Sequence, residues 1–310
     1  MIFTRLVLLE ACLWVAFSPL ATGARLQHER AQDCTTKDDK GCEKGQPSAD
    51  KPSAGCASKS EAACAEIQLG VQEFRSAQFS AALEHFQRAA GLDPQNVEAN
   101  LYVGMSYFQQ YVPGGEPEEN IRLAEEAARA FEDVLQTDPR SSTALNTLAL
   151  IYYNMKNFDR AKDYQSRRVD IEPKNPEPYY WIGVLDWSLC YPRRMQLRKD
   201  LNLSLPPDLT NPERLAPLPE EARLRLMGDN GFLVSEGIEK LEKAIELKPD
   251  YDDAMAYLSL MYREKLDLEV DDTARASDLE AAGQWVQRAI EVRKRAAQRN
   301  ASTNASQLEP

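Results

Sequence analysis

Five places in the chain have a small residue directly after a large apolar residue, and the spacing of these places constrains the fold. The small residues are Gly70, Gly104, Ala149, Gly183 and Ser259. The first and third intervals are both 34 residues, whereas the second is 45 and the fourth is 76. A period of about 20 to 50 residues is typical of stacked units that bury apolar surface against their neighbours. The sequence therefore predicts five such units, some of them carrying extra residues.

The apolar residues inside a unit follow a helical pattern. Leu145, Leu148, Ile151 and Tyr152, for example, recur at the three-to-four-residue spacing of an amphipathic helix. No alternating strand pattern of useful length occurs in the sequence. Each unit also has a second small residue, which indicates a second helix. We therefore predict an all-α fold, an α-solenoid whose repeating element is a pair of helices.

The extra residues lie between the first and the second helix of their own unit. The two small residues of a unit are 12 residues apart in units one and three, but 23, 54 and 22 apart in units two, four and five. Turns at this point emerge along one edge of a stack, so we expect the three insertions on the same edge. The insertion of unit two contains Pro113, Gly114, Gly115 and Pro117, which predict a loop.

The insertion of unit four, residues 190–231, is the largest. It contains six prolines and one segment, Glu220 to Leu226, that predicts a short helix. Trp187 is therefore expected to end the first helix of this unit. In unit five, a last helix is expected over about Thr273 to Gln298, and the tail 300–310 is expected to be disordered.

Aromatic, alanine, leucine and proline residues recur at fixed offsets from the small residue that begins each unit. In unit one they are Phe79, Ala82, Phe86, Ala89, Leu92 and Pro94. From residue 63 to residue 299 this pattern resembles the tetratricopeptide repeat. The resemblance implies about five helix-turn-helix units, and a face made by the first helices that binds an extended peptide or a helix of another protein. Glu73, Gln165 and Arg168 depart from the family pattern.

One position on the first helices is aromatic in four of the five units. It holds Phe74, Phe108, Tyr153 and Trp187, and then Arg263 in unit five. Such residues either pack against the next repeat or contact a ligand, and the sequence leaves both interpretations open. Trp187 is our hypothesis for an exposed anchor. The predicted peptide-binding residues are Phe74, Phe108, Asn146, Tyr153, Asn154, Tyr180 and Trp187, in which the two asparagines orient the bound backbone.

The first 24 residues have the order of a secretory signal peptide. Arg5 precedes an apolar run from Leu6 to Phe17, and small residues at 21–24 offer a cleavage site near Gly23 or Ala24. A retained membrane anchor is the alternative, although the run is shorter than the ~20 residues of a spanning helix. The sequence thus predicts export, to the periplasm or cell envelope or to the outside of the cell.

Residues 25–62 predict a flexible linker, because Lys, Asp, Ser, Ala and Gly dominate and no apolar period occurs. The four cysteines in and directly after it suggest two local disulfides outside the helical core, Cys34 to Cys42 and Cys56 to Cys64. A zinc site is a weaker alternative, since zinc motifs usually separate paired cysteines by two to four residues. Cys190 is left without a predicted partner.

Charge and composition exclude several function classes. A net charge of −12 opposes binding to nucleic acid. Only two histidines and no phosphate-binding glycine loop occur, so neither a common hydrolase nor a nucleotide site is predicted, and we expect no cofactor and no metal. Ile67 and Met105 stand where family members that clamp a carboxyl terminus have Lys and Asn. The prediction is a non-catalytic scaffold for a protein or peptide; a receptor for a small apolar ligand and an enzyme with its site in 190–231 are the alternatives.

Overall fold

The computed structural model describes residues 60–115, 117–203 and 216–306, with side chains as far as Arg299. Every described residue belongs to one compact part of the chain, Pro52–Pro310. The predicted signal peptide 1–24 and linker residues 25–59 lie outside the described residues. So do Cys34, Cys42 and Cys56.

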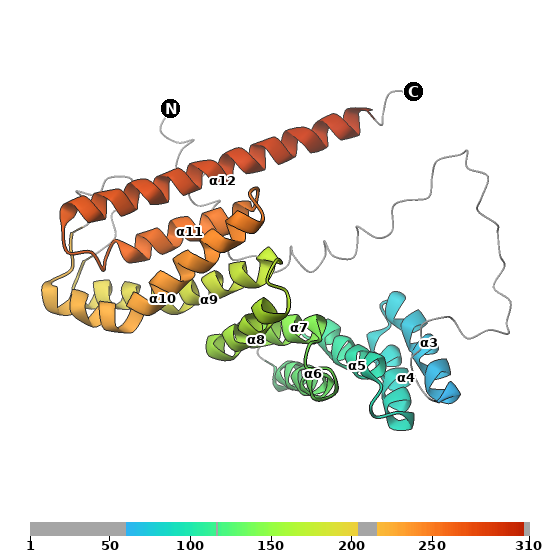
Figure 1. The fold of residues 1–310 in the computed structure, drawn as a ribbon. Helices are drawn as coiled ribbons and strands as arrows, with labels where there is room; N and C mark the ends of the chain where they lie inside the picture. Colours follow the sequence, from blue (N-terminus) through green and yellow to red (C-terminus); the bar gives the residue numbers. More distant parts are fainter. Residues whose placement is uncertain (1–59, 116, 204–215, 307–310) are drawn as a thin grey trace. The chain divides into compact units, whose positions relative to one another are not determined.

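The described residues form ten α-helices and no strand (Figure 1). Among them, no helix is both long enough and apolar enough to span a membrane. The helices are α3 (Glu61–Arg75), α4 (Phe79–Leu92), α5 (Val97–Gln110), α6 (Glu118–Thr137), α7 (Ser142–Asn154), α8 (Phe158–Ile171), α9 (Pro176–Asp200), α10 (Glu220–Leu247), α11 (Asp252–Lys265) and α12 (Asp272–Ser306).

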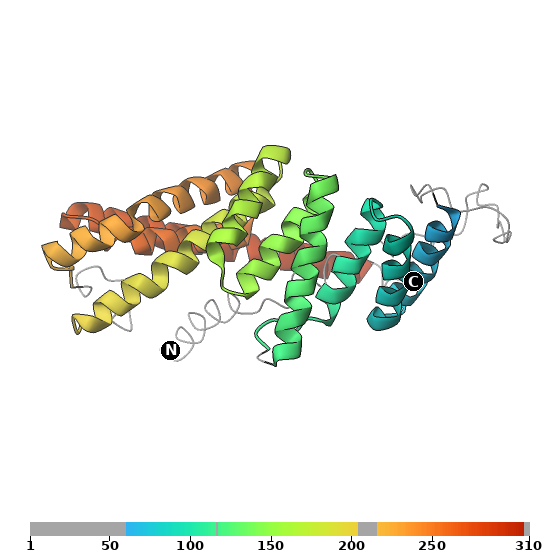
Figure 2. The same cartoon turned by 90° about the horizontal axis from the view of Figure 1, so that it is seen from below.

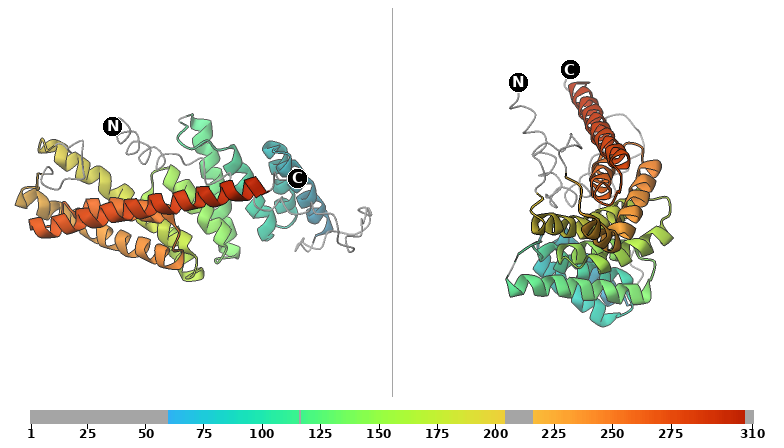
Figure 3. Two further views of the ribbon diagram at one scale, coloured as in Figure 1. Left: turned by 90° about the horizontal axis from the view of Figure 1, so that it is seen from above. Right: turned by 90° about the vertical axis from the view of Figure 1, so that its left-hand side faces the viewer.

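The helices pack as five successive pairs, which confirms the predicted all-α stack of five units. Each unit consists of a first and a second helix: α3 with α4, α5 with α6, α7 with α8, α9 with α10, and α11 with α12 (Figures 2 and 3). The second helix of each unit also packs on the first helix of the next unit. In addition, the first helices α9 and α11 contact each other directly. The longer connections, 111–117, 201–219 and 266–271, fall between the paired helices of units two, four and five, as predicted.

Side-chain caps define where most first helices begin. Ser60, Asn96, Ser141 and Asn175 each accept a hydrogen bond from a backbone N–H in the first turn of α3, α5, α7 and α9. Such a cap satisfies a donor that the helix itself leaves unpaired. Because Ser60 caps α3, the first helix starts at Glu61, slightly before the predicted boundary at residue 63.

The small residues of the first helices allow large side chains of the second helices to approach closely. A Cβ added at Gly70 would lie 2.6 Å from a ring carbon of the fully buried Phe86. A Cβ added at Gly183 would lie 2.8 Å from both methyl carbons of Leu241. The glycines that reveal the period are therefore the positions at which two helices of one unit meet.

The prediction for 190–231 places the extra residues correctly between the two helices of unit four, but it is wrong about where these helices end and begin. Trp187 does not end a helix, because α9 continues through Pro192 to Asp200. The predicted short helix at Glu220 is the start of α10, which runs without interruption to Leu247. Most of the insertion thus lengthens the two helices of unit four, and residues 204–215 between them lie outside the described residues.

Two smaller expectations also differ from the structure. The last helix, α12, continues to Ser306, so residues 300–306 are helical rather than disordered. Cys64 lies in the first turns of α3 and is buried, so it belongs to the helical core and not to the linker. Cys64 is disulfide-bonded. Its predicted partner Cys56 lies outside the described residues, and the predicted pairing stays a prediction.

Candidate functional site

Aromatic rings from the first helices of units three, four and five form one continuous row of contacts. We call this set the aromatic row: Tyr153, Tyr180, Trp181, Trp187, Tyr191, Tyr251 and Tyr257. Tyr153 on α7 contacts Trp181 on α9, with ring centroids 5.5 Å apart. Tyr180 contacts Trp181 at 5.5 Å and Tyr257 on α11 at 5.7 Å. The row therefore connects three successive first helices through edge contacts, which suit the quadrupoles of the rings.

Trp187 and its neighbours form the other end of the aromatic row. The Trp187 ring stacks on Tyr191 at 4.9 Å and meets Tyr257 edge-on at 5.6 Å. Only 8% of Trp187 is exposed, so the hypothesis of an exposed anchor is wrong. Its Nε1–H donor is buried and has no acceptor among the described residues.

The predicted binding residues fall into three groups. Tyr153, Tyr180 and Trp187 come together in the aromatic row. Phe74 instead packs in the core of units one and two, with ring contacts to Phe79, Phe86 and Tyr102. Phe108 packs on the core of units two and three beside Tyr111. The two asparagines lie on α7, where Asn154 is the last, half-buried residue and Asn146 belongs to a polar network.

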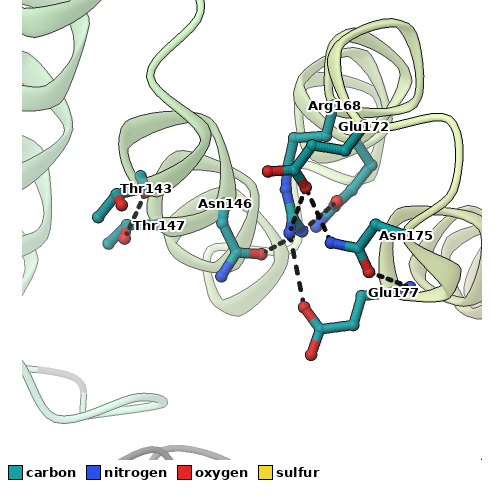
Figure 4. A network of polar contacts seen from close by, with 8 residues as sticks. Thr143, Asn146, Thr147, Arg168, Glu172, Asn175 and Glu177 are labelled. Carbon is teal, nitrogen blue, oxygen red and sulfur yellow. Dashed lines mark hydrogen bonds and ion pairs between the residues drawn. The ribbon is translucent and has the colours of Figure 1, made fainter.

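Arg168 is the centre of that polar network (Figure 4). It lies on α8, is almost fully buried, and donates from Nη1 to Asn146 Oδ1 at 2.7 Å and to Gln165 Oε1 at 3.1 Å. Its Nη2 faces the carboxylates of Glu172 and Glu177, both at 3.5 Å. The two departures from the family pattern in unit three, Gln165 and Arg168, are therefore partners of each other.

The network fixes how Asn146 presents its amide. Because Arg168 occupies Oδ1, the Nδ2 group is the half of the amide that is free to donate, and it has no acceptor among the described residues. Thr143 and Thr147 lie on the same helix beside Asn146 (Figure 4), and Thr147 Oγ1 donates to the Thr143 carbonyl at 2.9 Å. A backbone carbonyl of a bound chain would find its donor at Asn146.

An ion-pair group around the buried Asp186 joins unit three to unit four. Lys162 on α8 lies 2.6 Å from Asp186 on α9 and 2.5 Å from Glu236 on α10. Asp186 is fully buried, and this burial, partly opposed by Lys162, raises its pKa to about 7. Sequence reasoning missed this group. The signal was there, because Asp186 stands three residues after Gly183, where units two, three and five have Tyr107, Tyr152 and Tyr262.

The remaining reactive side chains are held in structural roles. Cys190 is a buried free thiol whose pKa burial raises to about 12, which disfavours the reactive thiolate. His85 lies 2.7 Å from Glu66, which also accepts from Arg88 at 3.0 Å. The part of the chain that the structure describes contains no group of His, Cys, Asp and Glu that could hold a metal ion.

Comparisons with known proteins agree with this architecture. Models of the family described as Tetratricopeptide repeat match residues 67–125 and 123–182. No curated protein matches the sequence. Among solved structures, a MamA RS-1 double mutant is similar at a TM-score of 0.51 and 15% identity, over 76% of this chain and 97% of that one.

Two further structures of MamA are similar to a comparable degree. MamA from Desulfovibrio magneticus RS-1 has a TM-score of 0.50 at 15% identity, over 76% of this chain and 98% of that one. A second MamA protein has a TM-score of 0.50 at 17% identity, over 77% and 95% of the two chains. At these identities the likeness concerns the fold.

Proposed function

Because this chain is a tetratricopeptide repeat protein, we propose that it is a non-catalytic scaffold that binds a segment of a partner protein along the first helices of units three to five. Proteins of this family bind protein or peptide partners. The observation that carries the proposal for this chain is the aromatic row, which joins α7, α9 and α11. Asn146 lies two turns before Tyr153 on α7 and adds an amide donor.

The chemistry of this face suits a polypeptide. Tyr153, Tyr180, Trp181 and Tyr191 are half-buried, so part of each residue stays accessible. Large, stiff aromatic side chains supply contact area at a low entropy cost and dominate many protein interfaces. Asn146 adds a donor for a peptide carbonyl, held in place by Arg168. The half-buried rings, rather than the buried Trp187, are the expected contact residues.

We also propose that the protein is exported. Arg5 and the apolar run from Leu6 to Phe17 support export, and so does the disulfide at Cys64, because disulfides persist in oxidising compartments. The mass of the protein recovered from the cells that make it tests this. Cleavage near residue 24 is expected, and an intact Met1 in a cytosolic fraction would contradict it.

Selection of peptides on the purified chain tests the binding proposal. A phage-displayed library of random twelve-residue peptides should yield enriched sequences on the immobilised protein. Synthetic copies should bind Trp181→Ala at least about tenfold more weakly than the original chain, because one row residue is lost. The matched control is Trp285→Ala, which removes a half-buried tryptophan of α12 outside the row. No enrichment, or equal losses for both variants after correction for folded fraction, would contradict the proposal.

A further inference from the structure

The contact between α9 and the end of α11 contains a buried group of charges. Arg194 Nε lies 2.8 Å from Glu264 Oε2, and Arg194 Nη1 lies 3.4 Å from Asp267 Oδ2. Arg198 pairs with Asp267 through two nitrogens, one of them at 2.6 Å. All four residues are at most 5% exposed. Two arginines thus face two carboxylates, so the formal charges of these four residues sum to zero.

Arg263 adds a third cation to this group, and no described residue supplies its counter-charge. It precedes Glu264 on α11 and is half-buried. None of the described carboxylates forms an ion pair with it, and it has no hydrogen bond to a described residue. Burial and the nearby Arg194 lower its pKa, which shows that its surroundings disfavour the positive charge. Burial also raises the pKa of Glu264 to about 7, so one of the two carboxylates is itself easily neutralised.

The position of Arg263 in its repeat connects this charge to the proposed binding face. Arg263 follows Ser259 at the same offset at which Trp187 follows Gly183 and Tyr153 follows Ala149. It therefore continues, in unit five, the position that contributes to the aromatic row in units three and four. An apolar residue at this position would destabilise the folded protein less than Arg263 does, because a half-buried cation without a partner keeps most of its desolvation penalty.

We infer that Arg263 binds a side-chain carboxylate of the partner segment, so that the partner is a peptide in which an Asp or Glu lies next to aromatic or apolar residues. The inference rests on the proposed function and names its partner class. Guanidinium and carboxylate form strong, often two-pronged hydrogen bonds. With a net charge of −12, the rest of the chain repels strongly acidic segments, so one or two acidic residues are expected rather than a long run.

Peptide selection on matched variants tests the inference. The library of random twelve-residue peptides is selected in parallel on the full chain, on Arg263→Met, and on Arg225→Met, a control that removes an exposed arginine of α10. Displayed peptides have no free carboxyl terminus, so only side chains can supply the anion. The full chain and the control should enrich Asp or Glu at one position, and Arg263→Met should lose this preference.

The outcomes separate this inference from the proposed function. Failure of every selection contradicts the proposed function, whereas enrichment of peptides without an acidic preference contradicts only the role of Arg263. A synthetic selected peptide should lose about tenfold in affinity for the full chain when its Glu is changed to Gln. The same Glu-to-Gln change in the peptide should reduce its affinity for Arg263→Met much less. Equal losses for both proteins would overturn the inference.

The melting temperature of the free protein distinguishes a ligand-binding arginine from a purely structural one, because removing the two should change it in opposite directions. If Arg263 awaits a ligand, Arg263→Met removes an unpaired cation and should keep or raise the melting temperature of the free protein. A fall of more than a few degrees relative to Arg225→Met would show that Arg263 stabilises the fold, and would overturn the inference.

Discussion

Removing the Trp187 side chain tests whether the aromatic row is part of the folded core. Trp187 is 8% exposed and contacts Tyr191 and Tyr257, so the ring fills space between the first helices of units four and five. Replacement of a buried Trp or Phe by Ala typically lowers the free energy of unfolding by about 3 to 5 kcal/mol. We expect Trp187→Ala to lower the free energy of unfolding by an amount in this range. Phe232→Ala, which removes a ring that is 74% exposed, should change the free energy of unfolding by less than about 0.5 kcal/mol.

Trp187→Phe distinguishes the packing of the ring from its polar group. The Nε1–H of Trp187 is buried without an acceptor among the described residues, and such a group costs about 1 to 3 kcal/mol. Phe keeps an aromatic ring for the contact with Tyr257 and removes this donor. The lost volume and the relieved donor oppose each other, so Trp187→Phe should change the free energy of unfolding by about 1 kcal/mol or less.

Urea unfolding followed by circular dichroism at 222 nm measures both variants, because this helical signal does not depend on tryptophan fluorescence. The expected order of urea midpoints is Trp187→Ala far below Trp187→Phe, with Trp187→Phe close to the original chain. A Trp187→Ala variant as stable as Phe232→Ala would refute the reasoning. Trp187 would then act as a surface residue despite its burial.

The remaining predictions concern packing and protonation. In urea unfolding, Gly183→Ala should be destabilising by about 1 to 3 kcal/mol, because the added Cβ meets Leu241. Gly228→Ala is the matched control: nothing lies within 4 Å of its Cβ, so it should be stabilising by about 1 kcal/mol. A stabilised Gly183→Ala would contradict the close contact. Burial raises the pKa of Asp186 and of Glu264 to about 7, so between about pH 4 and 7 the folded state keeps protons that the unfolded chain has lost. The free energy of unfolding should therefore fall as pH rises through this window, and Asp186→Asn should reduce the slope; an unchanged slope would contradict the raised pKa of Asp186.

The sequence predicted the fold well because the repeat is fixed by packing between neighbours. Gly70 and Gly183 lie under Phe86 and Leu241, and this contact requires a small residue on one helix and a large one on the other. Such a requirement recurs with the period and is visible in one sequence. Connections carry no comparable constraint, so their lengths could be read from the intervals but their structure could not.

The binding face was predictable only in part. Tyr153, Tyr180 and Trp187 were identified from their places in the repeat, and the structure brings them together. Their exposure was not predictable, since an equivalent position is covered or free depending on side chains of the next unit, such as Tyr257 beside Trp187. Phe108, at the same position in unit two, is half-buried and packs on the same core cluster as Tyr153, but its ring contacts Tyr111 instead of a residue of the aromatic row.

The length of α9 is the main feature that local rules could not give. Pro192 removes a helical hydrogen bond and costs about 3 kcal/mol in a helix interior, so local propensity ends the helix near Trp187. Beyond the proline, Arg194 and Arg198 lie four residues apart and therefore on one side of α9, where they meet Glu264 and Asp267. Removing one partner of a buried ion pair leaves the other charge unpaired and costs about 3 to 5 kcal/mol, so the arginines beyond Pro192 and the carboxylates at the end of α11 depend on one another. Such an extended helix does leave a signal in the sequence. Two arginines stand at helical spacing inside a proline-rich stretch, and two carboxylates stand at similar spacing in the next unit.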